Sequence, residues 1–280
     1  MRIDLHTHTH HSDGTDSPTE LMAKAAAAGL DVIALTDHDT IAGWAEAAAQ
    51  VPGTGVALVP GAEMSCTAGG ISVHLLSLLH DAADATLTRK FTRARTSRDT
   101  RAQEMVRLIA RDYPITWSDV QAQAGPGATI GRPHIADALV ARGHVADRTA
   151  AFEDILAAGG PYYVTHYAQD AIEAIHRVRA AGGVSILAHP RASARGRVIS
   201  DEVIARMADA GLGGLEVDHR DHDDADRAHL CRLAQDLDLL ITGASDYHGT
   251  GKMNQLGENT TSPQVLEAIE VRARGTVIRH

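Results

Sequence analysis

Histidine and carboxylate side chains recur in this sequence at the ends of short apolar runs. Two patterns are notable for their spacing, His6-Thr7-His8 near the start and Asp246-Tyr247-His248 near the end. Residues i and i+2 of a β-strand point to the same face, so each pair could bind one ion together. Imidazole nitrogen and carboxylate oxygen are common ligands of divalent metals. The sequence therefore predicts a metal-dependent hydrolase with several ions in one site.

Further candidate ligands come from other parts of the chain. Asp13 lies on the loop after the first pair, and Glu63 could bridge two ions because a carboxylate has two oxygens. A lone histidine at a strand end is more often a hydrogen-bonded surface residue than a metal ligand. Here seven strand ends carry histidine or carboxylate residues, and this recurrence favours the interpretation as metal ligands. The predicted metal ligands are His6, His8, Asp13, His38, Glu63, His74, His189, Asp246 and His248. His219, at another strand end, stays open between ligand and surface residue.

Other polar residues have simpler expected roles. Asp37 should point away from the face that His38 uses, so we expect it to accept a hydrogen bond or to support a ligand. His80 and His222 fall at loop positions, where a solvated or capping role is the default. The arginines that recur from Arg89 to Arg111 are expected to form mostly a solvated helix face.

Seven apolar runs are predicted to be strands: Ile3–Leu5, Val32–Leu35, Val56–Val59, Ile71–Leu79, Val184–Leu187, Leu215–Val217 and Leu239–Ile241. Ser17 and Pro18 are typical of a helix start, and they precede a predicted helix at Leu21–Gly29. The other helices predicted between the strands are Ile41–Gln50, Asp170–Ala181, Asp201–Ala210 and Asp224–Asp236. Ser262 opens a short helix before a candidate edge strand, Thr276–Arg279. Strands that alternate with helices indicate an α/β fold with a parallel sheet.

The alternation breaks after the fourth strand. Four helices are predicted there, at about Thr86–Arg111, Trp117–Ala124, Ile135–Arg142 and Phe152–Ala158. We therefore predict a helical insertion domain at 84–166, between the fourth and fifth strands. The barrel domain would consist of residues 1–83 and 167–280.

Composition limits the range of partners. The formal net charge of -10 argues against long nucleic acids and anionic membrane surfaces, although a small phosphorylated substrate remains compatible with it. The sequence has no apolar run long enough to span a membrane and no signal-peptide pattern, so we expect a cytoplasmic protein. Its two cysteines, Cys66 and Cys231, are far apart, which favours reduced thiols.

The ordered set of motifs from His6-Thr7-His8 to Asp246-Tyr247-His248 resembles the PHP family, named for polymerase and histidinol phosphatase. The resemblance covers nearly the whole chain. It implies a distorted (β/α)7 barrel with two or three divalent ions, manganese, iron or zinc, at the carboxyl ends of the strands. Within the family, Arg132-Pro133-His134 is similar to a motif of stand-alone phosphatases that act on 3′,5′-bisphosphonucleotides or 5′-phosphorylated ends.

This resemblance implies hydrolysis of nucleotide phosphate monoesters by a metal-bridging hydroxide, with Glu63, Arg132 and His134 as the catalytic residues. The planar guanidinium of Arg132 suits bidentate binding of phosphate. His134 could bind the same phosphate or protonate the leaving oxygen. Arg191 is a further candidate for phosphate binding. The chain departs from the group here, because Arg191 to Arg195 replace an expected Gly-Arg and a lysine expected near Gly160 is missing.

Three other functions remain open. Histidinol-phosphate phosphatase would use the same site chemistry. A 5′→3′ exonuclease on short RNA or DNA fits the motifs, although the negative net charge disfavours long polymers. The third is an inactive metal-binding module. No ligand position is replaced in this sequence, which argues against that function. The sequence leaves the oligomeric state open.

Overall fold

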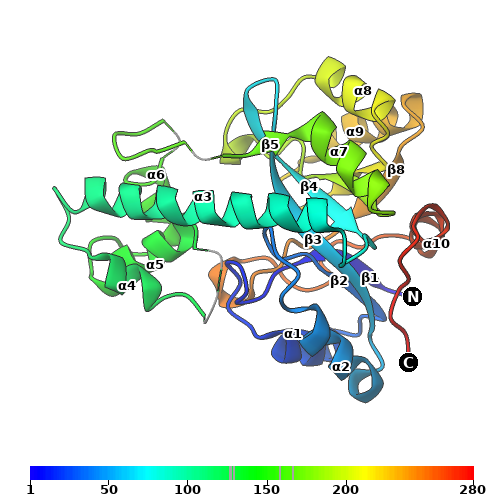
Figure 1. Ribbon diagram of the computed structural model, residues 1–280, viewed down its shortest axis with the longest axis horizontal. Coiled ribbons are helices and arrows are strands. Elements are labelled where there is room, and N and C mark those ends of the chain that lie inside the picture. The colour runs from blue at the N-terminus through cyan, green and yellow to red at the C-terminus, as the bar shows by residue number, and fades with distance from the viewer. Residues whose placement is uncertain (126–127, 129, 158, 166) are drawn as a thin grey trace.

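A nearly closed barrel of strands forms the centre of the protein (Figure 1). The computed structural model describes residues 1–125, 128, 130–157, 159–165 and 167–280, so Ala158 and His166, which end two predicted ranges, lie outside it. The strands are β1 (Ile3–Thr7), β2 (Val32–Leu35), β3 (Ala57–Ala68), β4 (Ile71–Leu78), β5 (Gln169–Asp170), β6 (Val184–Ala188), β7 (Gly214–Asp218) and β8 (Leu240–Gly243). Their order is β1-β2-β3-β4-β6-β7-β8, with β5 beside β3. Bridges from Thr7 to Tyr247 and from Ile3 to Thr261 bring the two edges together.

The predicted fold class is confirmed, with one difference in direction. β4 runs antiparallel to both β3 and β6, where strict alternation would give a parallel strand. The cause is the turn at Gly69-Gly70, where both glycines have positive φ (57° and 75°) and form a tight hairpin. Such a hairpin leaves no room for a crossover helix. Glu63 and His74 consequently lie inside neighbouring strands instead of at strand tips.

Six helices accompany the strands of the barrel: α1 (Pro18–Ala27), α2 (Trp44–Thr54), α7 (Ala171–Ala180), α8 (Asp201–Asp209), α9 (Asp224–Asp236) and α10 (Pro263–Arg272). Ser17 caps α1 and Pro18 is its first residue, as predicted. α2 begins three residues later than predicted, because Thr40 and Ile41 are irregular and residues 42–43 form a turn, with Thr40 Oγ1 accepting the Ala42 N–H. Of the predicted C-terminal edge strand, only a bridge from Ile278 to Leu58 forms.

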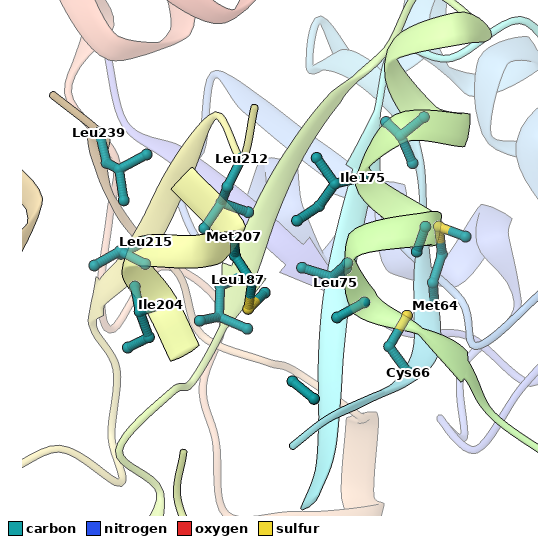
Figure 2. Packing of buried hydrophobic residues seen from close by; sticks show 14 of the residues in the cluster. Met64, Cys66, Leu75, Ile175, Leu187, Ile204, Met207, Leu212, Leu215 and Leu239 are labelled. Atoms are coloured by element: carbon teal, nitrogen blue, oxygen red, sulfur yellow. The ribbon is translucent and has the colours of Figure 1, made fainter. Parts of the chain in front are cut away.

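Aliphatic side chains fill the barrel and the layer between the sheet and its helices. Figure 2 shows Ile175 of α7 facing Leu75 of β4, and Met207 of α8 facing Leu187 of β6; all four are fully buried. A second cluster joins the strands on the other face, where Val59, Leu76 and Ile186 are among the buried residues. This packing makes the strands a rigid support for side chains at their ends.

The helices between β4 and β5 have an apolar core of their own. They are α3 (Ala85–Ile109), α4 (Trp117–Gln121), α5 (Arg132–Ala141) and α6 (Arg148–Glu153). Figure 1 shows α3 running beside the sheet, with the other three helices gathered at its far end. Met105 of α3 and Leu139 of α5 are fully buried in this core. Leu87 and Phe91 at the start of α3 pack on the main core instead, so the boundary at 84–166 stays a prediction. Within the described residues, no helix combines the length and the apolar character needed to span a membrane.

Candidate metal centre

Eight of the nine predicted ligands converge at one end of the barrel. They form three groups whose ligand atoms lie within 4.8 Å of one another: His6, His8, Glu63 and Asp246; His38, Glu63 and His74; and His8, Asp13, His38 and His248. The ninth, His189, joins them through Nε2, which lies 3.2 Å from Glu63 Oε1. All of them except His74 and His189 are buried. The structure therefore brings together the whole predicted set.

Glu63 lies at the centre of this cluster, and its two oxygens face different partners. Oε1 lies 2.7 Å from His74 Nδ1 as well as close to His189. Oε2 lies 3.3 Å from His6 Nε2, 3.1 Å from His8 Nε2 and 3.1 Å from His38 Nδ1. A carboxylate in this position can bridge two ions, which is the role expected from the sequence.

Local backbone geometry aims several of these side chains. β1 places His6 and His8 on one face, with their Nε2 atoms 3.1 Å apart. His189 and Asp246 follow strands β6 and β8 and adopt positive φ angles of 32° and 54°. Positive φ is unfavourable for residues other than glycine and is characteristic of functional sites held by their surroundings. The chain thus accepts local strain where it places ligands.

The donor set fits divalent cations. Asp13 Oδ1, His74 Nδ1 and His248 Nε2 are buried atoms that make no well-aligned hydrogen bond to any described residue. Yet His248 Nε2 lies only 3.1 Å from Asp13 Oδ1. Buried polar atoms normally have hydrogen-bond partners. Two lone pairs that face one another without forming a hydrogen bond are a suitable site for a shared metal ion.

The acidic ligands are held in their ionised form. Burial alone would raise the pKa of Glu63, but His38, His74 and His6 hold it well below its usual value. Burial opposes ionisation of Asp246 too, and Lys252 and Arg195 lower its pKa strongly. The pKa of Asp13 is likewise well below normal, against the effect of burial, because of nearby histidines. Ionised carboxylates are the form that binds metals.

Several imidazoles are held neutral. Burial and then Arg195 lower the pKa of His189 to about 3. Burial and then Lys252 lower the pKa of His248 to about 4. His8 behaves differently: burial would lower its pKa, but Asp246 and Glu63 raise it to about 9. Neutral imidazole carries the lone pair that a metal needs, and binding an ion near His8 would release its proton.

Two supporting carboxylates lie behind the ligands, one predicted and one missed. Asp37 accepts hydrogen bonds from Thr9 and from Ser12 Oγ, which in turn contacts His8 Nδ1 at 3.3 Å, so its predicted supporting role is confirmed. Glu216, in the middle of β7, was not predicted. Its Oε1 lies 3.0 Å from His6 Nδ1. The sequence did offer a signal for Glu216, because it is a lone acidic residue between the apolar strand residues Leu215 and Val217. The prediction considered only the end of this strand, at His219.

Two histidines expected at the surface are buried, and His219 lies behind a ligand. His80 and His222 are only 4% and 2% exposed, so of the two roles expected for them, solvated or capping, the solvated one is wrong. His219 is fully buried, and its Nδ1 accepts the Asp221 N–H, which leaves the proton of the neutral ring on Nε2. That Nε2 lies 3.6 Å from Asp246 Oδ2. His219 therefore faces Asp246 Oδ2, whereas His6 and His8 face the other oxygen, Oδ1. His219 belongs to none of the three ligand groups.

Arg98 of α3 reaches the predicted metal ligands and is an exception to the mostly solvated face expected of these arginines. Its Nη2 donates to Ser65 Oγ at 2.6 Å and lies 3.4 Å from His38 Nδ1. Asp39 Oδ2 is 3.3 Å from its Nε. The side chain is 12% exposed. The insertion thus contributes a cation directly beside a predicted metal ligand.

Arg101 and Arg132 extend this positive charge away from the cluster. Arg132 Nη1 donates to Leu156 O at 3.2 Å, and its guanidinium lies 5.2 Å from the centre of the Phe152 ring. Burial and then Arg132 lower the pKa of Arg101 to about 10. Burial lowers the pKa of Arg132, and Arg98 lowers it further, although Tyr163 acts in the opposite direction. Three partly buried cations that repel one another favour a bound anion, which would relieve the repulsion.

The remaining predicted contacts differ in position. His134 Nδ1 accepts the Gly131 N–H at 3.1 Å, so the neutral ring carries its proton on Nε2. His134 also lines a cavity of about 310 Å³ between the barrel and the insertion. Arg191 pairs with Asp226 at 3.1 Å, apart from the ligands. Arg195 takes the position beside the cluster, with Nη2 2.8 Å from Asp246 Oδ2. Phosphate binding by Arg191 stays a prediction.

Comparison with known proteins agrees with this geometry. The family model described as the PHP domain matches residues 4–178. The chain belongs to the PHP family. It is similar to a 3′,5′-nucleoside bisphosphate phosphatase of Chromobacterium violaceum (32% identity, covering 97% of both chains). It is also similar to a 5′-3′ exoribonuclease of Haemophilus influenzae (34% identity, covering 92% of this chain and 94% of the relative).

A solved structure shares nearly the whole fold. It is described as a metal-dependent phosphoesterase from Bifidobacterium adolescentis, with 41% identity and a TM-score of 0.94 over 97% of this chain and 96% of the other. Together with the convergent ligands, these relatives identify this PHP protein as a metal-dependent phosphoesterase. The predicted enzyme class is confirmed.

Proposed function

We propose that this PHP enzyme hydrolyses phosphate monoesters of nucleotides and prefers 3′,5′-bisphosphonucleotides. The observation that carries the proposal is that Arg98 lies beside the predicted metal ligand His38, with Arg101 and Arg132 continuing the positive charge from there. A substrate with two phosphates can place one at the metal ligands and the other at these guanidiniums. The similarity to a nucleoside bisphosphate phosphatase supports this preference.

The chemistry follows from the positions of the side chains. Two or three divalent ions would suit these ligands, and manganese, iron and zinc are candidates. When bound, they would lower the pKa of water, so that hydroxide is available to attack phosphorus, and they would offset the charge of the phosphate. Glu63 would hold two ligand groups at a fixed separation through its two oxygens. Arg132 would orient the second phosphate by charge-assisted hydrogen bonds. His134, with its proton on Nε2, would donate a hydrogen bond to the leaving oxygen.

Three other candidate substrates differ from the bisphosphate in charge or in number of phosphates. Histidinol phosphate carries an ammonium group, which the three arginines would repel. A short 5′-phosphorylated oligonucleotide has a second phosphate and so remains a candidate, with the exoribonuclease relative in its favour. AMP has one phosphate and would use the metal cluster without the arginines.

We also propose a cytoplasmic location and a small phosphorylated partner. Cys66 is buried and Cys231 is half-buried, and both are unpaired thiols. Unpaired thiols suit a reducing compartment. The net charge of -10 favours small nucleotides over long nucleic acids.

The test is phosphate release by the purified enzyme supplied with manganese. The panel contains adenosine 3′,5′-bisphosphate, AMP, a 5′-phosphorylated dinucleotide and histidinol phosphate, compared by kcat/KM. We expect the bisphosphate to give the highest value. Preference for histidinol phosphate would reject the nucleotide assignment, and preference for the dinucleotide would move the assignment to an exonuclease.

A further inference from the structure

Glu216 is a buried carboxylate that the proposed chemistry does not use. It lies in β7 between Leu215 and Val217, whose side chains pack in the main core, so its own side chain points to the opposite face. It is 0% exposed. A buried charge is costly unless it is paired and hydrogen-bonded, so its partners indicate why it is there.

Both oxygens of Glu216 bind residues that are predicted metal ligands. Oε1 lies 3.0 Å from His6 Nδ1. Oε2 accepts the backbone N–H of His189 at 2.8 Å. Each carboxylate oxygen of Glu216 therefore has its own partner in the predicted ligand set.

The contact with His6 decides which ring nitrogen is free. An ionised carboxylate only accepts, so Nδ1 of His6 must carry the proton that it donates. The lone pair is then on Nε2, which lies 3.3 Å from Glu63 Oε2 and 3.4 Å from Asp246 Oδ1. The contact with His189 acts on the backbone, at the residue whose φ is 32°. Glu216 thus supports an orientation that His189 would not adopt readily by itself.

Together with Glu63, these contacts close a ring of four residues, Glu63, His6, Glu216 and His189. His6 Nε2 faces Glu63 Oε2, whereas His189 Nε2 faces Glu63 Oε1 at 3.2 Å. Glu63 and Glu216 therefore hold the same two histidines from opposite sides. We propose that Glu216 is a positioning residue that sets two neighbouring ion positions at once, by orienting the ring of His6 and the backbone of His189. Partners of this kind are typically worth about 10–100-fold in metal affinity.

The test is metal binding by the Glu216→Gln variant. Glutamine keeps the shape but has one acceptor oxygen, so either His6 Nδ1–H or the His189 N–H loses its partner. Metal-free protein would be titrated with manganese by calorimetry, and the metal content would be measured after gel filtration. We expect affinity for at least one ion to fall by about 10–100-fold, with activity restored by excess manganese.

Thr242→Val is the matched control. Thr242 lies opposite Glu216 on β8, is 2% exposed, and donates to Leu215 O without contacting a ligand. We expect its manganese affinity to equal that of the unmodified enzyme, even if its melting temperature falls. Wild-type manganese affinity and stoichiometry in Glu216→Gln would overturn the proposal and leave Glu216 a purely structural residue.

Glu216→Asp provides a second variant if Glu216→Gln does not fold. Aspartate keeps two acceptor oxygens on a shorter side chain, so it should weaken manganese binding at unchanged net charge. Unaltered binding would again overturn the proposal. The inference rests on the metal centre of the proposed function and not on its substrate. A failed substrate panel with normal metal binding would therefore reject only the substrate.

Discussion

Arg132 is the residue on which substrate preference depends most. It begins α5, where a cation is electrostatically unfavourable, and it lies beside two other arginines. We expect Arg132→Ala to lower kcat/KM for adenosine 3′,5′-bisphosphate by about 10–100-fold, because a hydrogen bond to a charged group is worth about 1.5–3 kcal/mol. AMP, with no second phosphate, should lose much less. Steady-state kinetics on both substrates measures the difference.

Arg107→Ala is the control for this prediction. Arg107 also lies in the insertion, but it is exposed and paired with Glu104 of the same helix. Its removal should leave both substrates unaffected. Equal losses on the bisphosphate and on AMP after Arg132→Ala would place Arg132 at the reacting phosphate instead of the second one.

At the residue scale, the sequence predicted the ligands better than their support. His6 and His8 were recognisable because strand spacing places them on one face. Asp246 and His248 have the same spacing, but they follow β8 and fall in different ligand groups, so the expectation that this pair binds one ion together was wrong. Glu216 and Arg98 were not recognisable, because their roles depend on contacts across 210 and 60 residues of sequence. Such contacts exist only once the barrel has closed and α3 has packed beside it.

At the element scale, the insertion should control substrate binding and leave metal binding intact. Leu139 of α5 is fully buried in the core of the insertion, and none of the nine predicted metal ligands lies in α3–α6. We expect Leu139→Ala to destabilise this core by about 2–5 kcal/mol and to raise KM for the bisphosphate. Urea unfolding, kinetics and metal content would be measured together.

Leu187→Ala gives the contrast for that experiment. Leu187 is equally buried but lies in β6, two residues before His189. Its removal should reduce metal content as well as stability. A loss of bound metal in Leu139→Ala as large as that in Leu187→Ala would mean that the insertion and the barrel are one unit.

The elements themselves were largely predictable, with an informative exception. The apolar runs and Ser17-Pro18 indicated strands and a helix start correctly, because these signals are local. The direction of β4 was not foreseen, although Gly69-Gly70 was the available signal for a hairpin. The helices between β4 and β5 were predictable, but the contacts of Arg98 in α3 with Ser65 and His38 were not.

At the scale of the whole molecule, His80 makes stability depend on pH. It lies after β4 against Trp44 and Phe91, and burial lowers its pKa from the usual value of 6.5 to about 4. Between these values the unfolded chain binds more protons, so stability rises with pH and is lost as pH falls from 6.5 towards 4. The difference between the two pKa values implies that His80 can lower the free energy of unfolding by up to about 3 kcal/mol at acid pH.

The measurement for His80 is urea unfolding of metal-free protein from pH 7 to pH 4, with and without His80→Phe. Phenylalanine fills a similar space and does not titrate. The variant should lose up to about 3 kcal/mol less than the unmodified protein over this range. Parallel pH curves for the two proteins would show that His80 contributes nothing to acid destabilisation.

The most direct test of the whole account is metal reconstitution, with metal content and phosphate release measured on the same samples. Protein stripped of metal should release no phosphate from adenosine 3′,5′-bisphosphate, and activity should return in proportion to bound manganese. His8→Ala, which removes a residue shared by two ligand groups, should stay folded and inactive under the same treatment. Full turnover by verified metal-free enzyme, or by His8→Ala, would contradict the assignment of this cluster as the catalytic metal centre.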